Sequence, residues 1–141
     1  MPRKKDYLRL ARRTCEESNC ETAMSATIVR GGSVVAVGYN RKGFRAGSLH
    51  AEMDALRQLR YQKRGPEGTD IHVHRFGANG ELRMSKPCRE CFVALRDAGI
   101  SRIFYHDQNA VQHTIKVSQA QPDDFYEIHR DWHNGADELL V

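Results

Sequence analysis

No run of apolar residues in this sequence approaches the roughly 20 that a membrane-spanning helix needs. The longest candidates, such as Ser33 to Val37, have only the length of a strand. The basic N-terminus, Met1 to Lys5, leads into no apolar signal region, so we expect an intracellular, cytoplasmic protein without membrane contact. The chain also has only four cysteines in 141 residues, too few for a disulfide scaffold. Two of them form a Cys-x-x-Cys pair, which favours metal or redox chemistry in a reducing compartment.

The composition is that of a folded globular protein. Apolar residues make up 40% and charged residues 28%, which excludes collagen-like, low-complexity and wholly disordered chains. The length predicts one domain that spans residues 1–141. With 22 Lys and Arg against 18 Asp and Glu, the net charge is +4, which suits phosphate-bearing partners such as nucleotides or nucleic acid. An ordinary solvated surface explains the same charges.

Hydrophobic periodicity and turn residues predict three helices and five strands. The helices are expected at 6–18, 50–62 and 87–99, and the strands at 23–30, 33–39, 71–76, 103–105 and 113–117. Residues 40–49 are expected to form a loop, and 123–131 a further helical segment. This order predicts an α/β fold with three layers, a mixed five-stranded sheet covered by helices. The third and fourth strands should be parallel because a helix links them, and the last two antiparallel because their connection is short.

Two short motifs carry the chemistry: His50-Ala51-Glu52 and Pro87-Cys88-Arg89-Glu90-Cys91. Each begins a predicted helix, with Pro87 at a first helical position, where a missing N–H costs nothing. Cys88 and Cys91 are three residues apart and should share one helical face. Glu52 shares a face with Ala55, Leu56 and Leu59, so its carboxylate should point inward, where it needs a partner.

One imidazole and two thiolates are the ligand types that zinc prefers. Three protein ligands leave a fourth tetrahedral position open, as in catalytic zinc sites, and Glu52 is placed to move protons. Two other interpretations stay open. One is a structural zinc with a fourth ligand elsewhere. The other is a redox Cys-x-x-Cys pair, which would leave the His-Ala-Glu motif unexplained.

With these two motifs the chain resembles the zinc-dependent cytidine/deoxycytidylate deaminase superfamily, whose signature is H-x-E followed by P-C-x-x-C. The resemblance extends over the order of elements from about residue 5 to residue 118. It implies a three-layer α/β/α cytidine-deaminase-like fold and one zinc ion bound by His50, Cys88 and Cys91. It also implies that Glu52 shuttles protons, that the Ala51 N–H donates to the base, and that the chain forms a homodimer or tetramer.

Further residues are weaker candidates for substrate contacts. The resemblance implies that Asn40, in Gly38-Tyr39-Asn40, contacts the sugar of a substrate; the alternative is an asparagine that caps the end of a strand. Arg41, Lys42 and Arg45 follow and could bind a substrate phosphate, or form a solvated basic loop.

Several other residues have simpler interpretations. We expect the following to pack or to lie on the surface: His72 and His74 on the third strand, Cys15 and Cys20, Trp132 with His129 and His133, and the basic run Arg57, Arg60, Lys63 and Arg64. Each group also has a functional alternative. The histidines of the third strand could contact the pocket, and Cys15 and Cys20 could bind a second zinc ion. Trp132 and its neighbouring histidines could form a lid or a subunit contact, and the basic run could bind nucleic acid.

The sequence therefore predicts an enzyme that deaminates the cytosine of a free nucleoside or nucleotide (cytidine, deoxycytidine or dCMP type) to uracil and ammonia. The short connection between the fourth and fifth strands resembles the cytidine deaminase branch. The Gly38-Tyr39-Asn40 stretch and Ser85-Lys86-Pro87 before the cysteines resemble the deoxycytidylate branch. One alternative is deamination of cytosine or adenine within single-stranded RNA or DNA. A second is a non-catalytic zinc module that binds nucleic acid, which would not need Glu52.

Overall fold

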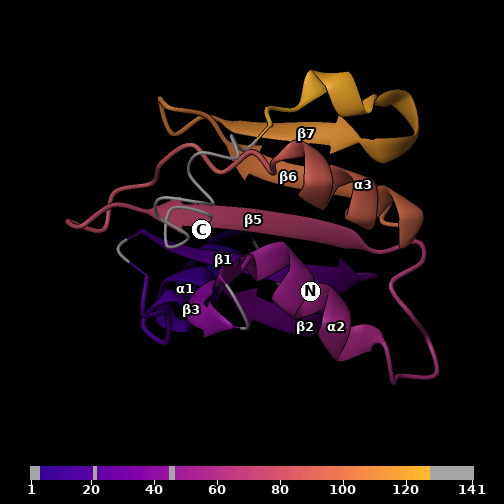
Figure 1. Cartoon of the computed structure of the whole chain (residues 1–141), viewed down its shortest axis with the longest axis horizontal. Coiled ribbons are helices and arrows are strands. Elements are labelled where there is room, and N and C mark those ends of the chain that lie inside the picture. Colours follow the sequence, from indigo (N-terminus) through magenta and orange to yellow (C-terminus); the bar gives the residue numbers. More distant parts are fainter. Residues whose placement is uncertain (1–3, 21, 45–46, 128–141) are drawn as a thin grey trace.

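A computed structural model describes residues 4–20, 22–44 and 47–127 (Figure 1). Its helices and strands, in chain order, are α1 (Lys4–Cys15), β1 (Ala23–Arg30), β2 (Ser33–Tyr39), β3 (Arg41–Phe44), β4 (Gly47–Leu49), α2 (Ala51–Leu59), β5 (Asp70–Phe76), α3 (Arg89–Asp97), β6 (Arg102–His106) and β7 (Gln112–Lys116). Two short 3₁₀ turns follow, η1 (Val117–Gln119) and η2 (Pro122–Asp124).

The main sheet has the order β2-β1-β5-β6-β7. β5 and β6 are parallel, whereas β6 and β7 are antiparallel, which confirms both predicted pairings. β1 and β2 form the predicted hairpin around Gly31-Gly32. Both glycines have positive φ angles (56° and 85°), a conformation that glycine adopts without steric cost and that matches a two-residue hairpin turn.

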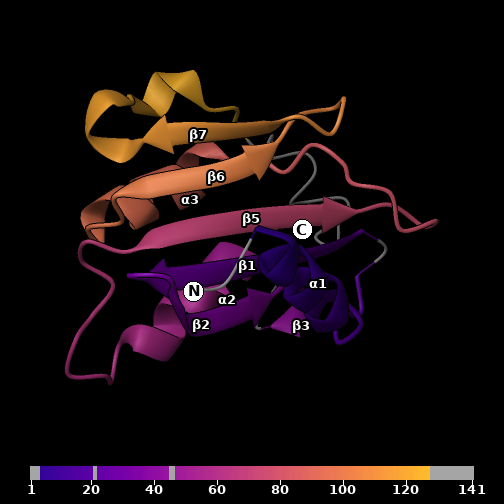
Figure 2. The same ribbon diagram turned by 180° about the vertical axis from the view of Figure 1, so that it is seen from behind.

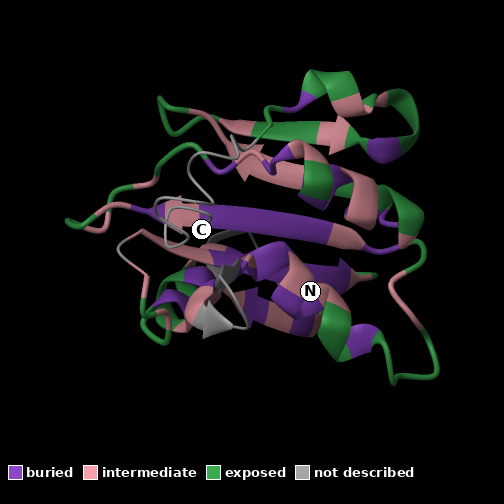
Figure 3. Cartoon of the chain, in the orientation of Figure 1, coloured by how far each residue is buried: buried purple, intermediate pink, exposed green. Residues whose placement is uncertain are grey.

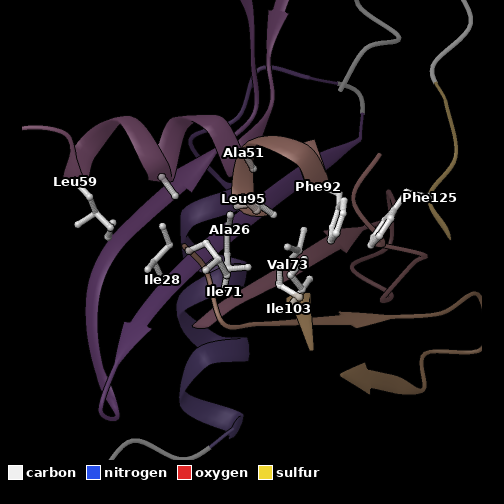
Figure 4. Close-up of a cluster of buried hydrophobic side chains, with 14 residues drawn as sticks. Ala26, Ile28, Ala51, Leu59, Ile71, Val73, Phe92, Leu95, Ile103 and Phe125 are labelled. Carbon is white, nitrogen blue, oxygen red and sulfur yellow. The ribbon is translucent and has the colours of Figure 1, made fainter. Parts of the chain in front are cut away.

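Helices cover both faces of this sheet, so the predicted three-layer α/β/α fold is confirmed. α2 and α3 lie on the face seen in Figure 1, and α1 lies on the opposite face, seen in Figure 2. β5 runs through the middle of the sheet and is buried along most of its length (Figure 3). The main core lies between the sheet and the pair α2 and α3, where Ile28, Leu59, Ile71, Phe92 and Leu95 are buried (Figure 4).

The helix boundaries differ from those predicted. α1 ends at Cys15 and α2 at Leu59, each three residues before the predicted end, because the last residues turn with i→i−3 bonds such as Ser18 N to Cys15 O and Gln62 N to Leu59 O. The predicted position of Pro87 was wrong. α3 begins at Arg89, and Cys88 is its N-cap, with the extended backbone that N-caps adopt.

Two predicted segments have a different structure. The expected loop 40–49 contains β3 and β4, which form a small antiparallel ribbon. Strands of four and three residues are too short for an alternation pattern to be recognised in the sequence. The segment 123–131 was expected to be helical, but its described residues, 123–127, form no α-helix: the turn η2 ends at Asp124 and Phe125 is extended. Residues 128–131, and with them His129, Trp132 and His133, lie outside the described residues.

No helix of the described chain combines the length and the apolar character needed to cross a lipid bilayer.

The face of the sheet under α1 contains several polar residues. Ser25 and Thr27 of β1 pair with His74 and His72 of β5, and all four are buried. The His72 ring is stacked on Phe104 (centroids 4.3 Å apart), which agrees with the packing role expected for it.

The environment of His74 leads to a prediction about acid stability. Burial lowers the pKa of His74 from 6.5 to about 3, and the neighbouring His106, His72 and Arg12 act in the same direction. The folded protein therefore keeps His74 neutral at a pH where the unfolded chain protonates it. Stability should fall as the pH drops from about 6.5 toward 3, with a loss of about 2 kcal/mol from this group at pH 5.

Urea unfolding at pH 7 and pH 5 measures this effect. His74→Phe removes the titrating ring and should reduce the stability lost between these two pH values. His113→Gln, at an exposed histidine, should leave the acid-side loss in place. Equal losses in the wild type and His74→Phe would show that His74 is not responsible.

Candidate metal centre

The three predicted metal ligands converge at the beginnings of two neighbouring helices. His50 is the N-cap of α2 and Cys88 the N-cap of α3, both with extended backbones (φ −72°, ψ 149° and φ −74°, ψ 169°). Cys91 lies within the first turn of α3. One donor atom from each of the three residues lies within 4.8 Å of the others, and His50 Nδ1 is 3.2 Å from Cys91 Sγ. The sequence therefore identified a group that can hold one ion.

The protonation of this group shows why it suits a cation. A hydrogen bond from the Cys91 thiol, helped by His50, lowers the pKa of Cys88 to about 4. The Cys91 pKa is raised by its contact with Cys88 and by burial. Burial alone would lower the pKa of His50, but its hydrogen bond to Cys88 and the nearby carboxylates raise it overall. A metal ion would replace the protons that these groups otherwise share.

The number of protein ligands, three, indicates a coordination shell with an open position. Among the described His, Cys, Asp and Glu residues, no fourth side chain joins His50, Cys88 and Cys91. Structural zinc sites have four protein ligands, whereas catalytic ones have three and an open position. The described residues thus fit zinc in the catalytic arrangement.

Glu52 lies in the first turn of α2 and is buried, with 2% of its surface exposed, as its helix face predicts. Its Oε1 atom has no hydrogen-bond partner. Burial, with a smaller contribution from Cys88, raises the pKa of Glu52, while His50 opposes this change. A buried carboxylate oxygen without a partner is costly, and a buried carboxyl group with a perturbed pKa is a candidate for a functional site.

The position of α2 depends on close contact with β2. At Gly38, an added Cβ would lie 2.4 Å from the Ala55 nitrogen and 2.5 Å from the Ala51 oxygen. On either side of Gly38, the Gln58 amide bonds to both the N–H and the C=O of Val37, and the Tyr39 N–H donates to Asp54. Only glycine allows the first turns of α2, with His50 and Glu52, to lie so near the strand.

Gly38→Ala should therefore disturb the metal centre. The new methyl group must push α2 away from β2, which moves His50 relative to the cysteines. We expect at least about 10-fold weaker zinc affinity and a lower melting temperature. Competition with a chelator measures the first effect and thermal unfolding the second.

Gly65→Ala is the matched control, because a Cβ there meets nothing within 4 Å. It should retain the zinc affinity of the wild type. Wild-type zinc affinity in Gly38→Ala would show that the close contact does not position His50.

Asn40 is completely buried and connects three segments of the chain. Its Oδ1 accepts hydrogen bonds from Ser18 Oγ (2.7 Å) and Met24 N (3.0 Å), and its Nδ2 donates to Thr22 O (2.8 Å). These bonds tie the end of β2 to the start of β1, which agrees with the structural alternative for this asparagine. A contact between Asn40 and the sugar stays a prediction.

The other expected substrate contacts lie in different environments. Arg41 donates to the buried Asp54 (2.7 Å) and its guanidinium lies over the Tyr39 ring, 4.2 Å from the centroid. Ala51 is the first residue of α2, so its N–H has no partner within the helix. Arg45 lies outside the described residues. Phosphate binding by Arg41 and Arg45, and donation from Ala51 to the base, stay predictions.

Sequence reasoning missed Tyr126, which lies near the metal centre on the segment after η2. The Tyr126 backbone oxygen accepts from Arg89 N (2.8 Å), and Phe125 is stacked on Phe92 (4.1 Å between centroids). Burial raises the pKa of the Tyr126 hydroxyl, and so do Cys88, Glu52 and Cys91, although 51% of the residue is exposed. No sequence motif includes this tyrosine. The one feature of the sequence that could have indicated it is the pair of neighbouring aromatic residues, Phe125 and Tyr126.

Cys15 and Cys20 show no sign of a second zinc site. In the described part of the chain they belong to no group of three potential ligands. Cys15, the last residue of α1, is buried in a cluster with Ala11 and Phe76, and burial raises its pKa to about 11, which is typical of an inert core thiol.

Comparison with known proteins identifies the family. Residues 1–107 match the model of the cytidine and deoxycytidylate deaminase zinc-binding region. The chain belongs to this family. Its metal is zinc, and His50, Cys88 and Cys91 form the group of described residues that can hold it. A comparison with curated protein sequences gave no match.

Solved structures of deaminases share the fold. A dCMP deaminase from the cyanophage S-TIM5 has 24% identity and a TM-score of 0.60, over 74% of this chain and 82% of the phage chain. A cytidine deaminase from Burkholderia pseudomallei has 16% identity and a TM-score of 0.69, over 86% and 98% of the two chains. One from Mycobacterium leprae has 17% identity and a TM-score of 0.60, over 84% and 97%. At these identities the similarity shows the fold alone.

Proposed function

We propose that this protein hydrolyses the amino group of cytosine in a free nucleoside or nucleotide, of the cytidine, deoxycytidine or dCMP type. Water and the cytosine base would give uracil and ammonia. The observation that supports this most is the convergence of His50, Cys88 and Cys91 beside a buried carboxylate, Glu52, that has an unpaired oxygen. Membership of the deaminase family and the similar fold of a phage dCMP deaminase, also solved with dCMP and dUMP, agree with it.

In this proposal the protein's own residues bind the base and carry protons. Zinc held by His50, Cys88 and Cys91 would supply the Lewis acidity that makes water nucleophilic near neutral pH. Glu52, whose pKa is raised by burial, accepts a proton from the attacking water and gives it to the ring nitrogen. It then accepts a second proton, from the hydroxyl that the water has added to the ring carbon, and gives it to the amino group, which leaves as ammonia. The Ala51 N–H at the start of α2 donates to the base and holds it in place.

Glu52→Gln separates proton transfer from metal binding. The amide cannot carry a proton, so turnover should fall at least about 100-fold, while the zinc content stays near that of the wild type. Cys88→Ala removes a ligand and should lose both zinc and activity. Metal analysis and ammonia release measure the two effects.

Glu16→Gln, at an exposed carboxylate that follows α1, is the control and should keep full activity. Near-normal turnover in zinc-loaded Glu52→Gln would exclude the proton-transfer role.

The substrate class is tested with a panel of compounds. Zinc-loaded protein is given cytidine, deoxycytidine, CMP, dCMP and single-stranded oligonucleotides that contain cytosine or adenine, and ammonia release is followed. We expect turnover of at least one free nucleoside or nucleotide. Turnover of the oligonucleotides alone would replace this proposal with a nucleic-acid deaminase, and no turnover at all would favour a non-catalytic zinc module.

Two surface features bear on partners. Tyr61 is 88% exposed beside exposed Arg60, Lys63 and Arg64, a combination of aromatic and basic groups that suits single-stranded nucleic acid and keeps the oligonucleotide alternative open. We also propose that the chain forms a homo-oligomer. A groove of about 610 Å³ between α2 and α3 is a mainly apolar surface that a second copy of the chain could bury. It is lined by Leu49, Met53, Leu56, Arg57, Arg60, Pro66, Ala94 and Ala98.

A further inference from the structure

Arg75 lies near the carboxyl end of β5, on the face of the sheet that carries α2 and α3. Side chains alternate between the two faces of a strand, so Arg75 points to the same face as Val73, which is part of the core under these helices. The next segment of the chain runs beside it: Arg83 N donates to Arg75 O (2.8 Å), and five residues later this segment reaches Cys88. Arg75 therefore lies on the side of the sheet that holds the metal centre.

The guanidinium of Arg75 lacks the partners that comparable arginines have. In the described chain, three other arginines are half-buried, and each donates to a protein oxygen: Arg30 to Gly65 O, Arg41 to Asp54, and Arg89 to Glu127. For Arg75, the described residues provide no hydrogen bond to the guanidinium and no ion pair, and its buried Nε has no partner. A buried N–H donor without an acceptor is unfavourable, and a bound ligand that accepts from it removes this cost.

The surroundings of Arg75 connect it to the groups already placed at the site. In the β1–β5 pairing it lies opposite Met24, whose N–H donates to Asn40 Oδ1. Burial is the main cause that raises the pKa of Tyr126; Cys88, Glu52 and Cys91 add to it, and Arg75 acts on the same hydroxyl in the opposite direction. Arg75 thus interacts electrostatically with the Tyr126 hydroxyl, which also interacts with Cys88, Cys91 and Glu52. No acidic side chain of the described chain neutralises it there.

We propose that Arg75 binds a phosphate ester of the substrate and so makes the site selective for nucleotides over nucleosides. This inference rests on the proposed deaminase function and specifies its substrate. A guanidinium presents its donors in a planar fork that matches two oxygens of a phosphate, and a phosphate would accept from the unpaired Nε. Arg41 also has a buried Nε without a partner, but it is a poorer candidate, because its Nη2 is already paired with Asp54 and its guanidinium lies over the Tyr39 ring. The phosphate can belong to a free nucleotide or to a polynucleotide.

Steady-state kinetics of Arg75→Gln test this proposal with three substrates: deoxycytidine, dCMP and a single-stranded oligodeoxynucleotide with one cytosine. Zinc content and melting temperature are measured for each variant, to confirm that the site is loaded and folded. We expect KM for dCMP to rise about 10-fold or more, with kcat/KM for deoxycytidine within about twofold of the wild type. Arg83→Gln, at an exposed arginine paired with Glu81, is the control and should change neither value.

The three arms distinguish the sources of the phosphate. A selective loss with dCMP supports recognition of a free nucleotide, and a selective loss with the oligonucleotide supports recognition of a polynucleotide. An equal loss with deoxycytidine, or a selective loss in Arg41→Gln instead of Arg75→Gln, would overturn the proposal.

Binding of dUMP and deoxyuridine, measured by calorimetry, tests Arg75 even if the protein turns over none of these substrates. The wild type should bind dUMP more tightly than deoxyuridine, and Arg75→Gln should remove most of that difference. No preference for dUMP in the wild type would contradict the role of Arg75, whereas failure of the deaminase function would appear as absent turnover with the preference for dUMP intact.

Discussion

The contact between α2 and β2 at Gly38 determines where the chemical groups of this protein lie. The helix backbone approaches the strand so closely that no side chain fits between them, and the bonds of Val37 and Tyr39 to α2 fix the helix along the strand. His50 and Glu52 are carried by the first turn of this helix. Cys88 and Cys91 are carried by the first turn of α3, which packs on the same core through Phe92 and Leu95. The metal centre thus lies where two rigidly packed helices begin.

This arrangement collects groups that repel one another when charged. Cys88, Cys91 and Glu52 all lose a proton to become negative, and all three are buried. Without a cation the protein must keep protons on some of them, which is why the pKa of Cys88 falls while those of Cys91 and Glu52 rise. A divalent cation at the thiolates would relieve the repulsion and leave Glu52 as the group that exchanges protons.

The sequence contained enough information for the parts of the fold that follow from local rules. The sheet, its parallel and antiparallel pairs, and the Gly31-Gly32 hairpin follow from periodicity, connection length and turn chemistry. The convergence of His50, Cys88 and Cys91 could be predicted from the ligand types in the two motifs, each of which begins a helix, and from the resemblance to the deaminase superfamily. The burial of Glu52 followed from its helical face.

Other features depend on tertiary contacts that no local pattern encodes. Tyr126 reaches the metal centre only because Phe125 packs on Phe92 and the Arg89 N–H holds its backbone. The sugar contact of Asn40 stays a prediction, and only the structure shows that its amide joins β1 to β2 through bonds to Met24 and Thr22. Arg41 and Arg75 look alike in the sequence. The buried Asp54, thirteen positions after Arg41, pairs with Arg41, whereas no described acidic side chain pairs with Arg75. No periodicity or motif in the sequence links Asp54 to Arg41.

Zinc K-edge X-ray absorption of the purified, zinc-loaded protein is the most direct test of the three-ligand centre. With His50, Cys88 and Cys91 as the protein ligands, the spectrum should show two sulfur atoms at about 2.3 Å and two lighter atoms at about 2.0 Å, one of them exchangeable with an added anion. A shell closed by four protein donors, or a spectrum without sulfur ligands, would contradict an open catalytic zinc site.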